Sequence, residues 1–275
     1  MKSLLSEAWR LEPFVPPFAF SAFFSPEDTL LCVCAAESAT DLVREPADTR
    51  IAELTSGSGL VGLYLLREVG GGRGEAGSRK REVGRGQREA GSGQREAALR
   101  STLLGLDVDP EAARIAEQNA RSLGLADRAR FAVSDLWAPG TLDLLRRERL
   151  HLLICNPPYV PEPPGKTMEI EAGAGPHGTA HLLRALELTE ELRPDALALS
   201  WCSLSDPVGI VSAAAEAGYD LVDLFVAVIA DGEYSGSVHD YLRNLDDCYI
   251  NESPDTLATL ASDGAARFGY LLFAG

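Results

Sequence analysis

Four consecutive residues, Asn156-Pro157-Pro158-Tyr159, have the side chains and rigidity to bind a flat NH2-bearing group. They follow an apolar run, 151–155, that predicts a buried strand. The two prolines fix φ and remove two backbone donors, so nearby carbonyl groups stay available as acceptors. The Asn156 amide oxygen could accept hydrogen bonds from an NH2 group, and the Tyr159 ring could pack on a planar amide or base. The alternative is a strand that ends in an ordinary proline-rich turn.

A glycine-rich turn lies earlier in the chain, between a strand predicted at Arg50–Leu54 and a helix predicted at Leu60–Glu68. The turn reads Thr55-Ser56-Gly57-Ser58-Gly59. Glycine permits unusual φ and a close approach of ligand to backbone, and the NH groups at a helix N-terminus attract anionic ligands. Strand, glycine turn and helix together are typical of nucleotide-binding units, although such a turn alone is a weak signal.

Residues 67–98 contain a tandem repeat with a period of 14. Arg67-Glu68-Val69-Gly70 recurs as Arg81-Glu82-Val83-Gly84. The stretch is rich in Gly and Arg and has little to bury, which predicts a disordered, low-complexity insertion in a helix–strand loop. From Gly70 to Arg100 there are eight Lys or Arg and four Glu, a local charge of +4. This loop could contact nucleic acid, but a solvated insertion is the favoured interpretation.

Without the repeats, the distance from the glycine turn to the acid at the end of the next strand is the one found in nucleotide-binding α/β units. Asp107 ends a predicted strand, Thr102–Asp107, and lies 48 residues after Gly59. Subtracting two 14-residue copies leaves 20, about the distance at which a nucleotide-binding α/β unit places the acid that accepts hydrogen bonds from ribose hydroxyls. Asp107 is therefore the predicted ribose ligand, with a plain surface acid as the alternative.

A third predicted strand, Ala129–Val133, is followed by Ser134-Asp135-Leu136-Trp137. An acid beside apolar residues at a strand end suits an adenine pocket, in which one polar acceptor meets the amino group between apolar walls. We therefore predict that Asp135 and Leu136 line an adenine site. Helix capping by Ser134 or Asp135 is an equally simple alternative.

Strands alternate with helices along the chain, which predicts a doubly wound α/β sheet whose ligand lies across the carboxyl ends of the strands. We expect residues 1–45 to form an N-terminal arm that could act as a substrate lid, and residues 46–275 to form the main domain. The remaining predicted helices are 26–42, 110–123, 142–147, 181–193 and 206–218. The remaining predicted strands are 196–203, 219–230 and 268–273. We expect irregular structure at 160–178 and 231–265.

Composition narrows the classes of function. The chain has 275 residues, is 45% hydrophobic and carries a net charge of −16, so it can bury a large core but is poorly suited to covering a phosphate backbone. No apolar run is long enough to span a membrane, and residues 1–24 do not read as a signal peptide. Five cysteines without paired spacing favour core thiols in a reducing cytoplasm. His177 and His181 lack an evident third ligand, so we predict no metal site.

The chain resembles class I S-adenosylmethionine-dependent methyltransferases. The resemblance rests on the turn at 53–59, on Leu106-Asp107, on Asp135-Leu136 and on the tetrapeptide 156–159. The chain is most similar to the branch that methylates planar NH2 groups, in particular the protein-glutamine N5-methyltransferases of the release-factor and ribosomal-protein type. Pro26-Glu27-Asp28-Thr29 also resembles a helix start of those enzymes. The resemblance covers about residues 20–220 and implies a Rossmann-like, mostly parallel sheet of seven strands.

The resemblance also implies roles for individual residues. S-adenosylmethionine would be the cofactor, with its methionine part held by the turn and by Glu53. Asp107 would bind the ribose, and Asp135 with Leu136 would line the adenine. Asn156 would contact both cofactor and acceptor and, with Pro157, would accept hydrogen bonds from the target NH2, while Pro158 and Tyr159 pack on it. The full set of implied site residues is Glu53, Thr55, Ser56, Gly57, Ser58, Gly59, Asp107, Asp135, Leu136, Asn156, Pro157, Pro158 and Tyr159.

Several hypotheses follow. The first is methylation of a protein glutamine amide, with a translation factor or ribosomal protein as partner. An alternative is methylation of an exocyclic amine of a DNA or RNA base, which the acidic charge disfavours. A nicotinamide-dependent oxidoreductase would use the turn and Asp107 but not the tetrapeptide. A non-catalytic binding module of the same fold is permitted by Thr55, where the family commonly has Gly, and by the foreign insertion. The helical substrate-docking domain that often precedes the core in this family is largely missing.

Overall fold

A computed structural model of the chain describes residues 26–44, 48–71, 100–225, 233–242, 244–245 and 270–274. The first 25 residues and the repeat segment 72–99 lie outside the described residues. The helices are α1 (Pro26–Thr40), α2 (Leu60–Gly71), α4 (Pro110–Ser122), α5 (Pro139–Arg146), α6 (Ala180–Leu192), α7 (Pro207–Glu216), α8 (Glu233–Gly236) and α9 (His239–Leu242). The strands are β1 (Arg50–Leu54), β2 (Thr102–Asp107), β3 (Ala129–Val133), β4 (Leu152–Cys155), β5 (Ala196–Leu199), β6 (Asp220–Phe225) and β7 (Tyr270–Ala274).

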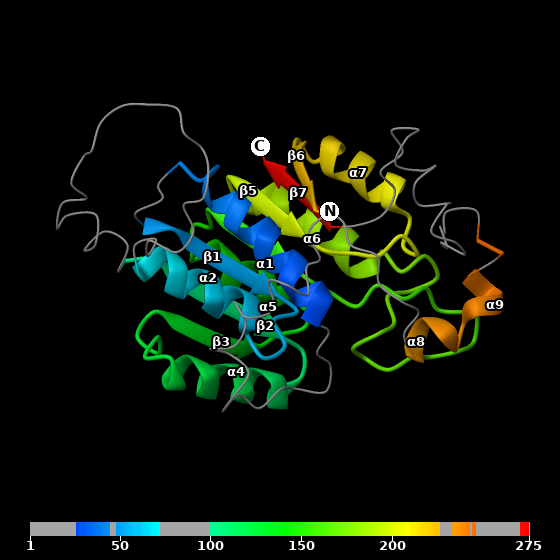
Figure 1. Cartoon of the computed structure of the whole chain (residues 1–275), viewed down its shortest axis with the longest axis horizontal. Helices are drawn as coiled ribbons and strands as arrows, with labels where there is room; N and C mark the ends of the chain where they lie inside the picture. Colours follow the sequence, from blue (N-terminus) through cyan, green and yellow to red (C-terminus); the bar gives the residue numbers. More distant parts are fainter. Residues whose placement is uncertain are drawn as a thin grey trace.

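The described strands form one sheet in the order β3-β2-β1-β4-β5-β7-β6 (Figure 1). Neighbours from β3 to β5 are parallel, whereas β7 is antiparallel to both β5 and β6. The predicted α/β fold with a mostly parallel sheet is confirmed. The strand order reverses between β1 and β4, and in doubly wound folds this is the point at which a ligand crosses the sheet edge.

Helices cover both faces of the sheet. Alternate residues of each buried strand point to opposite faces, so Ile51 and Leu103 share one core cluster with α1, α2 and α4. Ala52 and Leu104 point the other way and pack with α5, α6 and α7. Both faces are therefore buried, which explains why β1, β2, β4 and β5 are nearly continuous apolar runs rather than alternating ones.

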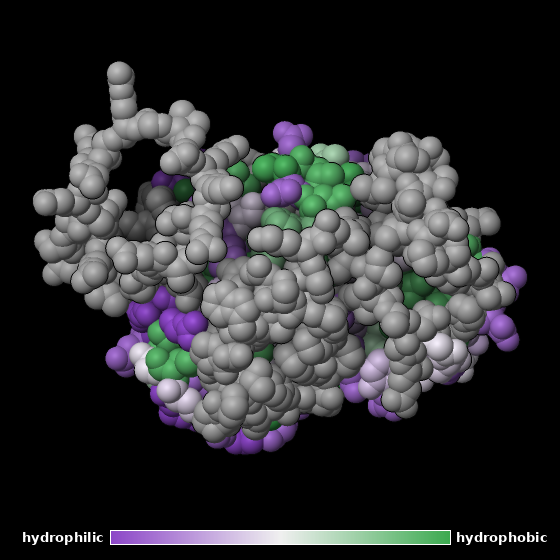
Figure 2. Space-filling view, viewed as in Figure 1, coloured by the Kyte–Doolittle hydropathy of each residue, from purple (hydrophilic) through white to green (hydrophobic). Residues whose placement is uncertain are grey.

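Helix α4 shows how sequence fixes the outer layer. Asp109 caps it, since its Oδ1 accepts from the Glu111 amide at 2.9 Å, and Pro110 occupies the first turn. Its alanines and Ile115 face the sheet, while the opposite side is exposed and polar. Figure 2 shows this polar surface as hydrophilic residues along the lower margin of the molecule. Among the described helices, none combines the length and apolarity that a bilayer crossing requires.

Several boundaries differ from the sequence prediction. Helix α5 begins three residues early, at Pro139, because proline suits the first turn of a helix. Strand β5 ends at Leu199, before the polar Ser200. The acidic 231–265 segment contains the short helices α8 and α9, so it is not wholly irregular. Helix α2 continues to Gly71, so the predicted insertion at 67–98 begins inside a helix and otherwise lies outside the described residues.

Helix α1 belongs to the core, although the sequence assigned residues 1–45 to an arm. Leu30, Cys32 and Val33 are almost fully buried in the same cluster as β1 and β4. Residues 26–44 therefore pack as a layer against the sheet, while the division of the chain at residue 45 stays a prediction. A lid formed by residues 1–25 stays a prediction.

Gly105 in β2 leaves room for the Phe131 ring, and this suggests a stability test. A Cβ at residue 105 would overlap the ring far more closely than real Cβ atoms do, and would lie 3.0 Å from Ser56 Oγ. Gly105→Ala should therefore lower the free energy of unfolding by about 1–3 kcal/mol, measured by urea denaturation. Gly140→Ala is the matched control: nothing lies within 4 Å of its Cβ position, so the free energy should be unchanged or rise. Equal effects at the two glycines would contradict the packing argument.

Candidate functional site

The predicted site residues meet at one edge of the sheet, around the carboxyl ends of β1, β2, β3 and β4. Strand β1 is the central neighbour, because Leu54 pairs with Leu106 on one side and with Cys155 on the other. The next residues, Thr55, Asp107 and Asn156, therefore emerge side by side. Asp107 in turn pairs with Val133, which brings the Asp135 segment to the same edge. The structure thus brings together all four predicted segments.

The glycine turn is held in a left-handed backbone path. Thr55, Gly57 and Gly59 have φ of 54°, 51° and 74°. The Ser56 amide donates to the Leu106 carbonyl at 3.0 Å, and the Gly59 amide closes the turn on the Ser56 carbonyl at 2.7 Å. Thr55 is not glycine, so its positive φ stores backbone strain of the kind found at ligand sites. A Cβ at residue 59 would lie 2.6 Å from the Phe131 ring, so the turn also needs glycine for packing.

Asp107 joins the turn to strand β2. Its Oδ2 accepts from the Gly57 amide at 2.7 Å, and its Oδ1 accepts from the Asp109 amide at 3.0 Å. Each carboxylate oxygen can accept a further hydrogen bond, so the carboxylate can fix the turn and still bind two hydroxyl groups. The residue is half-buried, which leaves the carboxylate reachable from the sheet edge.

Glu53 is a buried carboxyl, 4% exposed, beneath the turn. Its Oε2 accepts from the Gly62 amide at 3.1 Å. Burial raises the pKa of Glu53 from 4.5 to about 8, and the neighbouring Asp107 adds to the rise. An acid held neutral in this way would ionise when a cation, such as an amino group, binds beside it.

The raised pKa of Glu53 predicts a pH dependence of stability. The folded chain keeps this carboxyl protonated up to a pH of about 8, whereas the unfolded chain loses the proton near 4.5. Folding therefore takes up a proton in this window, and the free energy of unfolding should fall as the pH rises from 4.5 to 8. Urea midpoints measured across this range should decline more steeply for the wild type than for Glu53→Gln, which cannot titrate. Parallel curves would contradict the assignment.

The Asp135 segment is only partly as predicted. Asp135 is exposed, and its Oδ1 accepts from the Trp137 amide at 2.9 Å, whereas Leu136 is buried in the core. Neither Ser134 nor Asp135 caps α5, whose N-cap Ala138 has no side-chain cap hydrogen bond, so the capping alternative is excluded for that helix. Whether Asp135 and Leu136 line an adenine stays a prediction.

Sequence reasoning missed an aromatic pair beside this segment. Trp137 is 51% exposed, and its ring meets His181 edge to face with 5.0 Å between centroids. Burial lowers the pKa of His181, against the opposing effect of Glu162 and Asp135, and its buried Nδ1 has no hydrogen-bond partner among the described residues. The exposed indole could cover a flat ligand. Its place directly after Asp135-Leu136 was the available signal.

The tetrapeptide is anchored at Tyr159 and open at Asn156. Asn156 is half-buried, and its side chain has no hydrogen-bond partner among the described residues. Tyr159 Oη donates to Asp28 Oδ2 at 3.0 Å, and the Tyr159 carbonyl accepts from Ser205 Oγ. Burial and then the Asp28 carboxyl hold the pKa of Tyr159 well above its ordinary value, so Tyr159 stays a neutral donor. Asp28, itself only 3% exposed, was read from the sequence as part of a helix start, and its contact with the tetrapeptide was not foreseen.

The thiols near the site are inert. Burial raises the pKa of Cys155 to about 12 and that of Cys202 to about 11, and it raises the pKa of Cys32 further. None of the four described cysteines forms a disulfide with another described residue, and a thiol with a pKa raised as in Cys32, Cys155 and Cys202 is not a nucleophile near neutral pH. Cys248 lies outside the described residues. Within the described ranges, no group of three or more His, Cys, Asp or Glu residues could hold a metal ion.

Comparisons with known proteins give partial relatives. No protein-family model matches the chain. It is 47% identical over 58 residues to a release factor glutamine methyltransferase of Rhodospirillum rubrum, and 40% identical over 62 residues to one of Moorella thermoacetica. These alignments span 21% and 22% of this chain but only 16% and 20% of the relatives' length. The similarity to those enzymes is thus clear but local.

Comparison with solved structures gives distant matches. A precorrin-6y C5,15-methyltransferase from Geobacter metallireducens aligns with a TM-score of 0.48 at 11% identity, covering 95% of each chain. A ribosomal protein L11 methylase from Lactobacillus delbrueckii aligns with a TM-score of 0.44 at 15% identity, covering 78% of each chain. Both TM-scores lie below 0.5, so neither bears on the function of this chain. By its motifs and its local matches, the chain resembles class I methyltransferases of the release-factor glutamine type.

Proposed function

We propose that this chain transfers a methyl group from S-adenosylmethionine to the nitrogen of a planar NH2 group, and that this group is the side-chain amide of a protein glutamine. One observation carries the proposal: the Asn156–Tyr159 tetrapeptide and the Asp107-linked glycine turn emerge from adjacent parallel strands at the same sheet edge. The local matches to release factor glutamine methyltransferases support the choice of acceptor.

The residues at the turn fit the proposed cofactor. Ser56 Oγ is buried without a hydrogen-bond partner among the described residues, which is costly unless a ligand supplies one. The carboxylate of Asp107 keeps acceptor capacity for ribose hydroxyls, and the neutral Glu53 could ionise beside the cofactor's amino group. When bound, S-adenosylmethionine supplies a methyl group on an electrophilic sulfonium.

The chain's own residues would prepare the acceptor nitrogen. An amide nitrogen is a poor nucleophile because its lone pair is delocalised into the carbonyl. The two N–H groups of the target amide would donate hydrogen bonds to the Asn156 side-chain oxygen and the Pro157 carbonyl. These hydrogen bonds would direct the nitrogen lone pair toward the methyl group and stabilise the positive charge that develops on nitrogen. Tyr159, fixed by its hydrogen bond to Asp28, would pack on the flat amide. Alignment of the two reactants would supply much of the remaining rate.

The experiment is transfer of a tritiated methyl group from S-adenosylmethionine, tested in parallel on three acceptors: a Gly-Gly-Gln peptide, total nucleic acid, and fractionated cell lysate. Label in the peptide or in lysate protein is expected, and mass spectrometry should place it on glutamine. Label confined to nucleic acid would instead establish the alternative acceptor, an exocyclic amine of a base. Cofactor binding without label in any fraction would favour a non-catalytic binding module.

A further inference from the structure

The connection from β6 to β7 begins and ends at the edge of the sheet where the predicted methyl-transfer site lies. Strand β7 is antiparallel to both β5 and β6, so β6 runs in the same direction as β5. The chain therefore leaves β6 and enters β7 at the carboxyl ends of the parallel strands. Two short helices of this connection, α8 and α9, are set apart from the helices that cover the faces of the sheet (Figure 1). The proposed reaction gives them no role.

Helices α8 and α9 pack on the loop that continues from the tetrapeptide, residues 160–178. Five buried residues form the contact, two from the helices, two from the loop and one from the turn before α7: Val238, Leu242, Val160, Ala172 and Leu204. Val160 directly follows Tyr159, which packs against the same cluster. The cluster therefore joins the two helices to the tetrapeptide.

Hydrogen bonds from two tyrosines of the helices hold the same segments together. Tyr234 Oη donates to Glu171 Oε1 at 2.8 Å, and Tyr241 Oη donates to the Pro176 carbonyl at 3.1 Å. The paired residues are 63 and 65 positions apart in the chain, so only the fold brings them together. Both bonds end on the loop and none on the sheet, so they act on the loop alone.

The loop itself is folded back and closed by backbone hydrogen bonds. The Val160 amide donates to the Ala172 carbonyl at 2.9 Å, and the Glu162 amide donates to the Gly175 carbonyl at 2.9 Å. The Ala174 amide donates to the Val160 carbonyl at 3.1 Å. A surface loop with few buried contacts opens readily. Because α8 and α9 cover its apolar residues, they should keep this loop closed.

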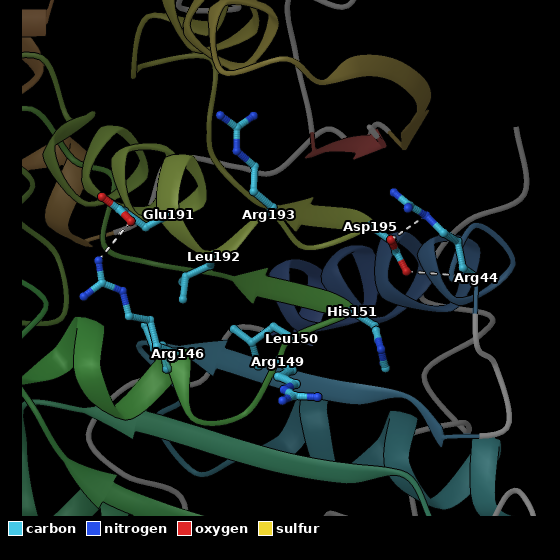
Figure 3. A pocket seen from close by; sticks show the side chains of 10 residues that line it. Arg44, Arg146, Arg149, Leu150, His151, Glu191, Leu192, Arg193 and Asp195 are labelled. Atoms are coloured by element: carbon cyan, nitrogen blue, oxygen red, sulfur yellow. Dashed lines mark hydrogen bonds and ion pairs between the residues drawn. The ribbon is translucent and has the colours of Figure 1, made fainter.

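The opposite end of the sheet is held in a different way. Around a pocket of about 420 Å3 there, Arg44 pairs with Asp195 at 2.8 Å and Arg146 pairs with Glu191 at 2.9 Å (Figure 3). Ion pairs that face solvent contribute little to stability. The end with the predicted site is therefore the one at which an added apolar contact fastens a loop.

We propose that α8 and α9 form a brace for the acceptor side of the site: they fix the loop 160–178, and through Val160 they fix Tyr159, for a polypeptide acceptor. The inference rests on the proposed methyl transfer to a protein. The two prolines have fixed φ, so a shift at Tyr159 would carry over to the Pro157 carbonyl and to Asn156. A loop that is already ordered binds a polypeptide without the entropy loss of ordering it. Cofactor binding should not depend on the brace, because the glycine turn and Asp107 belong to other strands.

The double variant Tyr234→Phe/Tyr241→Phe tests the proposal, because it removes both hydroxyl groups and keeps the rings. Hydrogen exchange followed by mass spectrometry should show exchange at least about fivefold faster in peptides that cover 160–175, and no change at 152–155. The kcat/KM for the protein or peptide acceptor that the wild type labels should fall about tenfold, since small misplacements at a reacting group have effects of this size. Calorimetry should show an unchanged affinity for S-adenosylmethionine.

Tyr64→Phe/Tyr219→Phe is the matched control. It removes the same two kinds of hydrogen bond, one to the Glu37 carboxylate and one to the Pro194 carbonyl, at places away from the loop. Both tyrosines are buried, so the control should lose at least as much in melting temperature while exchange at 160–175 and acceptor kinetics stay as in the wild type. Val238→Asp places a charge in the cluster and should enlarge both effects of the tyrosine variant.

The outcomes separate the brace from the reaction it serves. Unchanged exchange at 160–175 in Val238→Asp would overturn the brace. Faster exchange with unchanged acceptor kinetics would overturn its role in acceptor binding and leave the proposed methyl transfer standing. If the wild type labels no acceptor at all, the proposed function fails, and the acceptor role of the brace fails with it.

Discussion

Replacing Asn156 with alanine should lower the rate of methyl transfer by about 10²–10³-fold, the cost typical of removing one preorganised polar group from a transition state. The side chain is half-buried and has no hydrogen-bond partner among the described residues, so its amide oxygen is available to the acceptor. Single-turnover methyl transfer to a Gly-Gly-Gln peptide would measure the effect. Because the glycine turn and Asp107 remain intact, calorimetry should show a change of less than about tenfold in cofactor affinity.

Asn156→Asp is the matched control for this prediction. Aspartate keeps an acceptor oxygen in the same place and differs from asparagine in charge rather than shape. It should retain more activity than the alanine variant. Full activity in Asn156→Ala would refute the proposed role of the tetrapeptide. A loss of cofactor affinity as large as the loss of rate would instead show that Asn156 binds the cofactor and not the acceptor.

Replacing Asp107 with alanine should weaken S-adenosylmethionine binding by at least about 10²-fold and lower the free energy of unfolding by about 2–4 kcal/mol. Two backbone amides, those of Gly57 and Asp109, would lose a charged acceptor, and hydrogen bonds to charged groups are worth about 1.5–3 kcal/mol each before the chain relaxes. The cofactor would lose the acceptor for its ribose as well. Calorimetry and urea denaturation measure the two effects separately.

Asp109→Ala provides the comparison two residues away. Asp109 caps α4 by accepting from the Glu111 amide, so its loss should cost about 1 kcal/mol of stability and leave cofactor affinity nearly unchanged. If both variants lose stability but keep their affinity for S-adenosylmethionine, Asp107 would be a structural residue of the turn rather than a ribose ligand.

Much of the fold could be predicted from the sequence because the signals are local. Apolar runs that end in polar residues located β1, β2 and β4, and the 48-residue gap from Gly59 to Asp107 became intelligible once the 14-residue repeats were recognised. Parallel pairing then required Thr55, Asp107 and Asn156 to meet at one edge, as they do. The helix predicted at 142–147 begins at Pro139 instead, since proline is favoured in the first turn of a helix and marks its true start.

The contacts that the sequence did not reveal are those between distant segments. Asp28 and Tyr159 are 131 residues apart, and neither residue type alone signals a partner. The same holds for the edge-to-face pair of Trp137 and His181. The raised pKa of Glu53 also depends on packing, since burial under the turn causes it. Whether the arm, Asp135 and Leu136 act as the resemblance implies stays a prediction.

The place at which the repeats enter the chain bears on how related sequences can diverge. Helix α2 ends at Gly71 and β2 begins at Thr102, so the repeats join the fold on the side of the sheet away from Asn156. Composition predicts a loop for residues 72–99, and lengthening a loop is thermodynamically cheap, about 0.6 kcal/mol for each doubling. Gain or loss of whole 14-residue copies at this position would therefore be nearly neutral for stability and catalysis. Homologous chains should accordingly differ in copy number here while keeping the spacing of their sheet-edge residues.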